Sequence, residues 1–261
     1  MSVILLDNTR KIGRLLHNNS SFVVVFNDIC RCVGDILNAN VMVVSAKGKV
    51  LGIFEKDGLP FLHDMLTDRV GKVIDPKLND RFLSVLSTKE NVNLVTLGFE
   101  EDENREFSAV IMPVDFAGER MGTTFIYRPK KEFEVDDIIL SEYANTVIEL
   151  EMMRSLYEED IENKRKTEVI RAAMESLSAS EKESIGYIFK ELDAKEGLLV
   201  ASRVAEKYNI TRSIIVNAIR KLEGAGIIES KSQGMRGTYL KVLNDALFEW
   251  SADGTKKSDT E

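Results

Sequence analysis

The sequence predicts an α+β protein with two folded domains joined by a long helix. Before residue 130, short apolar segments are separated by turn residues, a pattern typical of a small antiparallel sheet. From Val135 onward the apolar residues instead recur at helical spacing. Between Val200 and Val242 a short helix, a tight turn, a longer helix and a hairpin follow one another. A chain of 261 residues is long enough for two hydrophobic cores.

Residues 1–134 are expected to form one domain around a five-stranded, largely antiparallel sheet. The expected strands are residues 41–45, 50–54, 92–99, 107–114 and 120–127. Two helical patterns precede them, and two more helices are predicted at 59–66 and 76–86, where Pro60 and Pro76 suit the first helical turn. Helices covering such a sheet are typical of GAF-like or PAS-like sensor domains, which enclose a cavity for a small-molecule effector.

A long connecting helix is expected from Val135 to about Arg171, within a linker that spans residues 135–177. The stretch from Tyr157 to Glu168 is almost wholly charged. A helix that is polar on all sides commonly bridges two domains through solvent. We therefore expect this linker helix to connect the sensor domain to the domain that follows it.

Residues 178–245 are expected to form a winged helix-turn-helix, a module that places one helix in the DNA major groove. A capping box of Ser180 and Glu183 is predicted to begin its first helix. Residues 227–242 are expected to form a two-stranded ribbon with a glycine-containing tip. The polar tail of residues 251–261 is expected to be disordered.

The longer helix of this module, residues 214–223, has an apolar face and a polar face, and Thr211 is expected to cap it through its hydroxyl. Its apolar residues at helical spacing are Ile214, Ile215, Ala218, Ile219 and Leu222. The residues expected to face base edges or adjacent phosphates are Arg212, Ser213, Val216, Asn217 and Arg220. The residues expected to contact phosphate are Lys221, Lys231, Arg236 and Lys241. Val216 suits a thymine methyl group, but it is equally consistent with an ordinary surface valine.

Charge is distributed unevenly along the chain. From Arg203 to Lys241 there are eight Lys or Arg residues and three Asp or Glu residues, a net charge of +5, whereas the whole chain carries −8. A basic module in an otherwise acidic protein is typical of binding to double-stranded DNA. A module that docks to another protein is the alternative, and the salt dependence of DNA affinity separates the two cases.

Other classes of function find little support in the residues. No apolar run approaches the length of a membrane span and the first residues do not form a signal peptide, so we expect a cytoplasmic protein with no membrane partner. The few histidines and cysteines have no zinc-site spacing. Cys30 and Cys32 are expected to pack in the interior without a mutual disulfide. Because no G-x-x-x-x-G-K-[ST] loop and no Ser/His/Asp set occur, we expect no enzyme and no catalytic cofactor.

The segment from Leu198 to Asn244 resembles, almost without gaps, the DNA-binding half of the CodY family of global repressors of Gram-positive bacteria. Weaker similarity appears in K-G-K-V-L-G at 47–52, G-E-R-M-G-T at 118–123 and D-D-I-I-L-S-E-Y at 136–143. The resemblance implies a homodimeric repressor of nutrient and stationary-phase genes that binds AT-rich, near-palindromic operators. It also implies a GAF domain that binds a branched-chain amino acid, chiefly isoleucine, and in many members GTP.

For GTP, the family's contact positions correspond here to Ser45, Lys47, Lys49 and Glu151. The lysines would lie near the phosphates, and the carboxylate would accept hydrogen bonds from guanine N–H groups. Ala46 replaces one of the family's arginines, and Leu156 stands where the family has a lysine. The alternative interpretation is that these are ordinary turn lysines and a surface glutamate.

For the amino acid, Thr96 is the residue nearest to the family's pocket threonine. The family's carboxylate-binding arginine has no counterpart, because residues 51–68 contain no arginine and Lys56 is the only cation there. An unpaired carboxylate inside a cavity is strongly unfavourable. Either Arg69 or Lys56 therefore holds the carboxylate, or the chain senses another ligand or GTP alone, or it has lost sensing.

Overall fold

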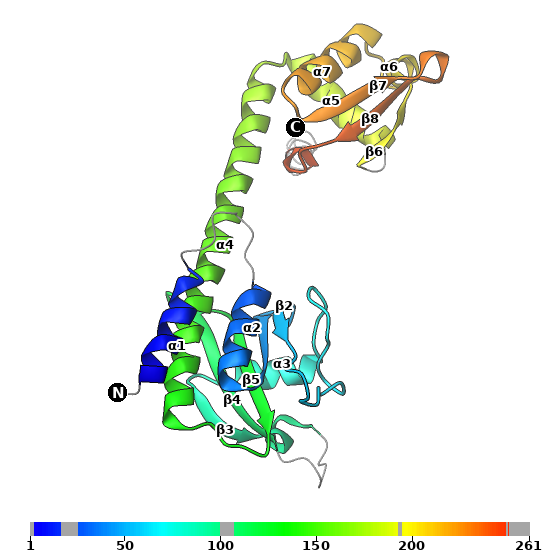
Figure 1. Ribbon diagram of the computed structural model, residues 1–261. Helices are drawn as coiled ribbons and strands as arrows, with labels where there is room; N and C mark the ends of the chain where they lie inside the picture. The colour runs from blue at the N-terminus through cyan, green and yellow to red at the C-terminus, as the bar shows by residue number, and fades with distance from the viewer. Residues whose placement is uncertain (1–2, 17–25, 100–106, 193–194, 249, 251–261) are drawn as a thin grey trace. The chain divides into compact units, whose positions relative to one another are not determined.

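The structure, a computed structural model, describes residues 3–16, 26–99, 107–192, 195–248 and 250. The tail of residues 251–261, for which disorder is predicted, lies outside these residues. The chain divides into two compact units, Met1–Leu156 and Tyr157–Glu261 (Figure 1). None of the described helices is long and apolar enough to cross a membrane.

The N-terminal unit is built on a five-stranded sheet in the order β2-β1-β5-β4-β3, with every neighbouring pair antiparallel. Its strands are β1 (Asn40–Ser45), β2 (Val50–Phe54), β3 (Lys89–Asn93), β4 (Phe107–Phe116) and β5 (Glu119–Pro129). Its helices are α1 (Val3–Arg14), α2 (Phe26–Leu37), α3 (Pro76–Leu83) and the first part of α4 (Val135–Glu175). The predicted antiparallel sheet with flanking helices is confirmed (Figure 1).

The two faces of this sheet are covered by different elements. Successive side chains of a strand point to opposite faces, so Val41 and Val43 belong to one core cluster and Met42 and Val44 to the other. The first cluster packs the sheet against α1, α2 and α4. The second packs it against α3, including Phe82, and against the loops beside that helix. The sheet therefore forms the middle layer of the unit.

Residues 59–66, predicted to be a helix, form turns and irregular backbone instead. The Pro60 carbonyl accepts a hydrogen bond from Asn40 Nδ2 at 2.9 Å, and the Leu62 amide donates to the Tyr127 hydroxyl at 3.5 Å. A helix over residues 59–66 would pair the Pro60 carbonyl internally, so the bond from Asn40 replaces a helical hydrogen bond. The prediction is wrong because contacts with the sheet outweigh the local apolar spacing.

The strand predicted at 92–99 is also mostly wrong. β3 ends at Asn93, and Leu94–Leu97 form a 3-10 helix, η1. The Asn93 side chain caps η1 by accepting a hydrogen bond from the Val95 amide at 2.9 Å, and Gly98 ends it with a φ of 86°. Local capping therefore replaces strand pairing after Asn93.

Helix α4 runs without interruption from Val135 to Glu175 and contributes to both units. Near its start, Ile138 and Ile148 join the core of the N-terminal unit, and near its end Ile170 joins the core of the C-terminal unit. No residue from 156 to 169 is buried. The predicted long helix is confirmed, and each of its ends forms part of a domain core.

The C-terminal unit combines a helix-turn-helix with a three-stranded sheet in the order β6-β8-β7. Its helices are α5 (Ala179–Leu192), α6 (Ala201–Lys207) and α7 (Arg212–Gly224). Its strands are β6 (Glu196–Leu199), β7 (Ile228–Ser232) and β8 (Thr238–Val242), with the turn η2 (Gly234–Arg236) between the last two. The predicted ribbon of β7 and β8 is confirmed, but β6, which the sequence pattern does not predict, pairs with β8 as a third strand.

The capping box of α5 is formed by Ser178 and Glu181 and not by the predicted Ser180 and Glu183. The Ser178 amide donates to Glu181 Oε2 at 2.8 Å, and the Glu181 amide donates to Ser178 Oγ at 3.3 Å. This reciprocal pair satisfies amides that the start of a helix leaves free. Both tetrads fit the S-x-x-E pattern, and only the helix start at Ala179 distinguishes them.

Candidate DNA-binding surface and effector site

Helix α7 is anchored through its apolar face. Ile215 and Leu222 are buried in the core of the C-terminal unit, as predicted, whereas Ile214 is only half-buried. Thr211 occupies the N-cap position, but its side chain makes no bond to the helix amides. Its hydroxyl lies 3.0 Å from the Ser213 hydroxyl instead. The predicted cap position is therefore confirmed, and the predicted capping bond is wrong.

The opposite side of α7 carries the side chains predicted to contact bases. The exposed ones are Arg212, Ser213, Asn217 and Arg220, and Val216 is half-buried beside them. A groove of about 520 Å³ lies between α7, the start of α6 and the β7–β8 hairpin. Arg212, Val216 and Arg220 line its helix side, and Ser232 and Thr238 line its hairpin side. Guanidinium and hydroxyl donors therefore surround one groove, where an anionic, acceptor-rich partner fits.

The β7–β8 hairpin presents its basic residues in a different direction from the groove lining. Because strand side chains alternate, Ser230 faces the groove while Lys231 points to the outer face of the sheet. Lys241 lies on the same outer face, directly opposite Glu229 on β7. Arg236 is exposed at the tip, in η2. Arg236 at the tip is therefore an exposed cation, whereas the charge of Lys241 lies next to the carboxylate of Glu229.

Lys221 differs from the other predicted phosphate contacts. Its ammonium donates to Glu181 Oε2 at 2.7 Å and to the Ser176 carbonyl at 3.1 Å. Each residue of a helix is turned by about 100° from the one before, so Lys221 leaves the groove that Arg220 lines. Its charge is directed toward the connection between α4 and α5.

The residues predicted to contact GTP come from the β1–β2 hairpin and from α4. Lys47 and Lys49 are exposed on the hairpin turn. Glu151 on α4 is only 3% exposed, and its Oε2 has no hydrogen-bond partner among the described residues. Its Oε1 lies 3.9 Å from Arg154 Nη1. A buried carboxylate oxygen without a donor is a strong acceptor for an incoming N–H group.

The hairpin and α4 meet at Gly122 of β5. Ser45 on β1 is the strand partner of Gly122. A Cβ placed on Gly122 would lie 3.1 Å from the end of the Met152 side chain, which follows Glu151 on α4. The predicted GTP residues Ser45 and Glu151 are thus drawn from elements that converge on one position of the sheet.

The face of the sheet on which Thr96 was predicted to line a pocket is filled by aromatic side chains. Phe82, Phe125 and Tyr127 are fully buried there, with ring centroids 5.0 Å apart for the first pair and 5.1 Å for the second. Burial raises the pKa of the Tyr127 hydroxyl, so this group stays protonated. Thr96 itself is exposed on η1, and its hydroxyl donates to the Asn93 carbonyl at 2.6 Å.

The cations proposed for a ligand carboxylate have other partners. Lys56 Nζ donates to Asp35 at 2.7 Å, and Arg69 is exposed and pairs with Asp68 at 3.8 Å. A cation that sequence reasoning missed, Arg81 of α3, donates to a carbonyl of η1. One arginine on an amphipathic helix gives no signal that singles it out.

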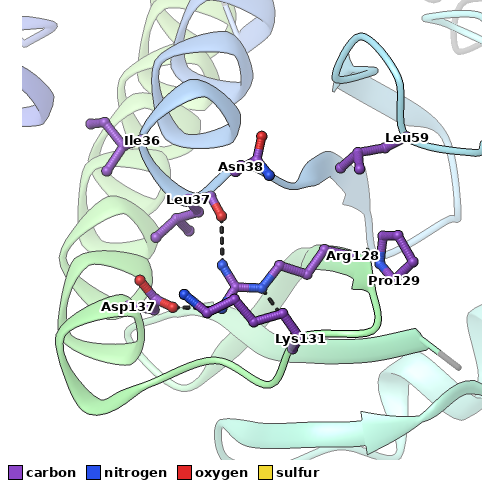
Figure 2. Close-up of a pocket in the computed structure, with 8 residues that line it drawn as sticks. All are labelled: Ile36, Leu37, Asn38, Leu59, Arg128, Pro129, Lys131 and Asp137. Atoms are coloured by element: carbon purple, nitrogen blue, oxygen red, sulfur yellow. Dashed lines mark hydrogen bonds and ion pairs between the residues drawn. The ribbon is translucent and has the colours of Figure 1, made fainter.

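Arg128, at the end of β5, was also missed and is only 4% exposed. Its guanidinium donates to the carbonyls of Leu37 and Lys131 and to Asp137 Oδ2 (Figure 2). It also donates to the Glu132 carbonyl. A cavity of about 200 Å³ lies beside it. Since the guanidinium is turned toward acceptors of the chain itself, this position is a junction of β5, α2 and α4 and not an effector site.

Cys30 is buried and Cys32 is half-buried, and both are free thiols. Burial raises the pKa of each thiol, which keeps both protonated and weakly nucleophilic. The prediction that they pack in the interior without a mutual disulfide is confirmed.

Comparison with known proteins gives matches along most of the chain. The family model described as the CodY GAF-like domain matches residues 4–176, and the one described as the CodY helix-turn-helix domain matches residues 195–252. The chain is 46% identical over 249 residues to the global transcriptional regulator CodY of Thermoanaerobacter sp., covering 94% of this chain and 96% of that protein. It is 43% identical to the global transcriptional regulator CodY of Clostridium tetani, with the same shares covered. The solved cofactor binding GAF domain of the nutrient sensor CodY from Clostridium difficile is 32% identical, covers 58% of this chain and 99% of its own, and has a TM-score of 0.43.

Proposed function

The chain belongs to the CodY family of DNA-binding global transcriptional regulators, and on that premise we propose that it represses transcription by placing α7 in the DNA major groove. The observation that carries the proposal is that Arg212, Asn217 and Arg220 of α7 are all exposed, and that Arg212 and Arg220 line the same groove. Arginine offers two parallel donors to guanine, and asparagine offers a donor and an acceptor to adenine. The arrangement therefore suits reading of base edges as well as attraction to phosphate.

The side chains are assigned by their direction. We propose that Arg212, Ser213, Asn217 and Arg220 contact base edges or adjacent phosphates, with Val216 near a thymine methyl group. Lys231, Arg236 and Lys241 contact phosphate from the hairpin. Glu223, the acid of the groove, accepts a hydrogen bond from the Ser230 amide at 2.9 Å and so ties α7 to β7.

The operator is double-stranded, AT-rich and near-palindromic, and two copies of the chain bind it. A homodimer with two-fold symmetry places its α7 helices in successive major grooves, about 34 Å apart. The palindrome of the operator then mirrors the symmetry of the protein. Because its proposed partner is DNA, we also propose that the protein is cytoplasmic.

The N-terminal unit senses a small-molecule effector, and GTP fits the hairpin and α4 better than an amino acid fits the opposite face. Guanine N–H groups would satisfy Glu151 Oε2, while Lys47 and Lys49 carry the charge that phosphates need. Ser45 adds a hydroxyl at the start of the turn. The chain binds GTP without hydrolysing it, so no phosphate is released.

Isoleucine is not held in the manner of the family, because aromatic side chains fill the face next to Thr96 and Lys56 is paired with Asp35. A regulator that responds to GTP alone, to another ligand or to none agrees with this packing. Calorimetry on the full chain with isoleucine and, separately, with GTP tests both statements. A binding heat with isoleucine would contradict the proposal that isoleucine is not held. No binding heat with GTP would contradict the proposed nucleotide site.

The DNA-binding proposal is tested by fluorescence anisotropy at several salt concentrations. The probes are a duplex selected by the full chain from a random pool and a scrambled duplex of the same composition. We expect tight binding to the selected duplex, with an affinity that falls steeply with salt as counterions are released. A module that docks to a protein gives no selected sequence and a shallow salt dependence.

A further inference from the structure

Lys221 joins three parts of the C-terminal unit. It lies on α7, and its ammonium reaches the Ser176 carbonyl just beyond the end of α4. It also reaches Glu181 Oε2, the oxygen that accepts the Ser178 amide in the capping box of α5. One side chain of α7 is therefore bonded to both helix ends that meet at residues 176–178.

Each of these bonds matches the electrostatics of a helix end. The last carbonyls of a helix have no internal partner and carry partial negative charge, which an ammonium at Ser176 offsets. Glu181 is buried, so its carboxylate depends on donors within the chain. The Lys221 ammonium, followed by the Ser178 amide, lowers the pKa of this carboxyl below its ordinary value. Two of the three ammonium donors are thus used inside the unit.

Building on the proposed reading of DNA by α7, we propose that Lys221 is a positioning residue that sets the rotation of α7 about its own axis. It stands next to Arg220, on the side of the helix turned toward the α4–α5 connection. Helix α7 cannot rotate about its axis without breaking the bonds from Lys221 to Ser176 and Glu181. The direction of Arg220 and Asn217 toward base edges follows from that constraint, so Lys221 affects sequence selectivity without contacting DNA.

The test compares Lys221→Ala, Glu181→Gln and the double variant with a matched control, Lys190→Ala, which removes one exposed charge from α5. Each full-length protein is titrated with the selected and the scrambled duplex at several salt concentrations. Thermal unfolding identifies any variant that fails to fold. Glu181→Gln keeps an acceptor for the Ser178 amide, so the capping box is retained. This variant tests the contact with Lys221 if Lys221→Ala does not fold.

We expect Lys221→Ala to lose roughly fivefold in affinity for the selected duplex, the size of effect typical of a residue that acts on a binding site without contacting the ligand. Its affinity for the scrambled duplex should change little. Glu181→Gln should lose affinity in the same selective way, and the double variant should be no worse than Lys221→Ala. Lys190→Ala should leave the selectivity unchanged.

A phosphate contact would give a different result. Affinity for both duplexes would then fall equally, the salt slope would decrease by about 0.9, and Glu181→Gln would have no effect, which overturns the proposal. Unchanged selectivity in folded Lys221→Ala overturns it as well. If the wild-type chain selects no duplex at all, the proposed function itself fails, and the two failures are thereby distinguished.

Discussion

Arg128 and Asp137 form an ion pair of 2.6 Å that joins the end of β5 to the first turn of α4. The arginine side chain is 5% exposed and the aspartate side chain 22% exposed. The same guanidinium binds the Leu37 carbonyl at the end of α2, so one side chain holds three elements together (Figure 2).

Arg128→Met is therefore expected to destabilise the N-terminal unit by about 3 kcal/mol, because it leaves a partly buried carboxylate and several carbonyls without their donor. Hydrogen exchange of the β5 amides in the full chain measures the loss. Lys131→Ala, which removes only an exposed pair with Glu134, is the control and should change stability by less than about 1 kcal/mol. Equal protection of β5 in both variants would show that the junction contributes little.

Gly122→Ala is expected to disturb the sheet where β1 and α4 meet. Its Cβ would lie 2.2 Å from the Val44 carbonyl oxygen, a backbone atom that cannot move without shifting β1. We expect the free energy of unfolding to fall by about 1–3 kcal/mol and GTP affinity to fall with it, as calorimetry would record. Gly186→Ala on α5, where a Cβ meets nothing within 4 Å, is the matched control and should be neutral or slightly stabilising. Loss in both variants would point to a general intolerance of alanine.

The pH dependence of the C-terminal unit is expected to depend on Glu181. Its pKa is lowered in the folded chain by Lys221 and by the Ser178 amide. The stabilisation is therefore complete above the ordinary carboxyl pKa of about 4.3 and is lost as the pH falls through the lower, folded value. Thermal unfolding from about pH 6 down to pH 3 should show a smaller acid destabilisation in Glu181→Gln than in the wild type. Identical pH profiles would mean that other carboxyls dominate.

The parts of the fold that are predictable from sequence are those in which local pattern and tertiary packing agree. The strand β1 and the helix α7 were predicted correctly as elements, and most of the apolar stripe of α7 is buried, although Ile214 is only half-buried. The prediction of a helix at residues 59–66 was wrong because Asn40 and Tyr127, which are distant in sequence, form hydrogen bonds with the backbone of this segment. The third strand β6 was missed because four residues with little alternation acquire their strand structure from the free edge of β8.

The candidate site residues were likewise predicted correctly only where their position depends on local pattern. Helical spacing is enough to place Arg220 and Asn217 on the exposed side of α7, because that depends on one element alone. The partners of Lys221 and Arg128 come from other elements, and spacing within one helix or strand carries no information about them. Lys221 was thus predicted to be a phosphate contact from its charge, while its direction depends on Glu181.

Arg220→Ala and Lys231→Ala are expected to weaken DNA binding in different ways. Arg220 lines the groove of α7, where we propose that it forms a bidentate pair with a guanine, so its loss should cost about 1–3 kcal/mol and relax the preference at one operator position. Lys231 lies on the outer face of β7, where we propose that it contacts phosphate and no base, so its loss should weaken selected and scrambled duplexes equally and reduce the salt slope by about 0.9. Anisotropy titrations with single-base operator variants separate the two patterns. Equal losses on operator and scrambled DNA for Arg220→Ala would remove it from base reading and leave it as another phosphate contact.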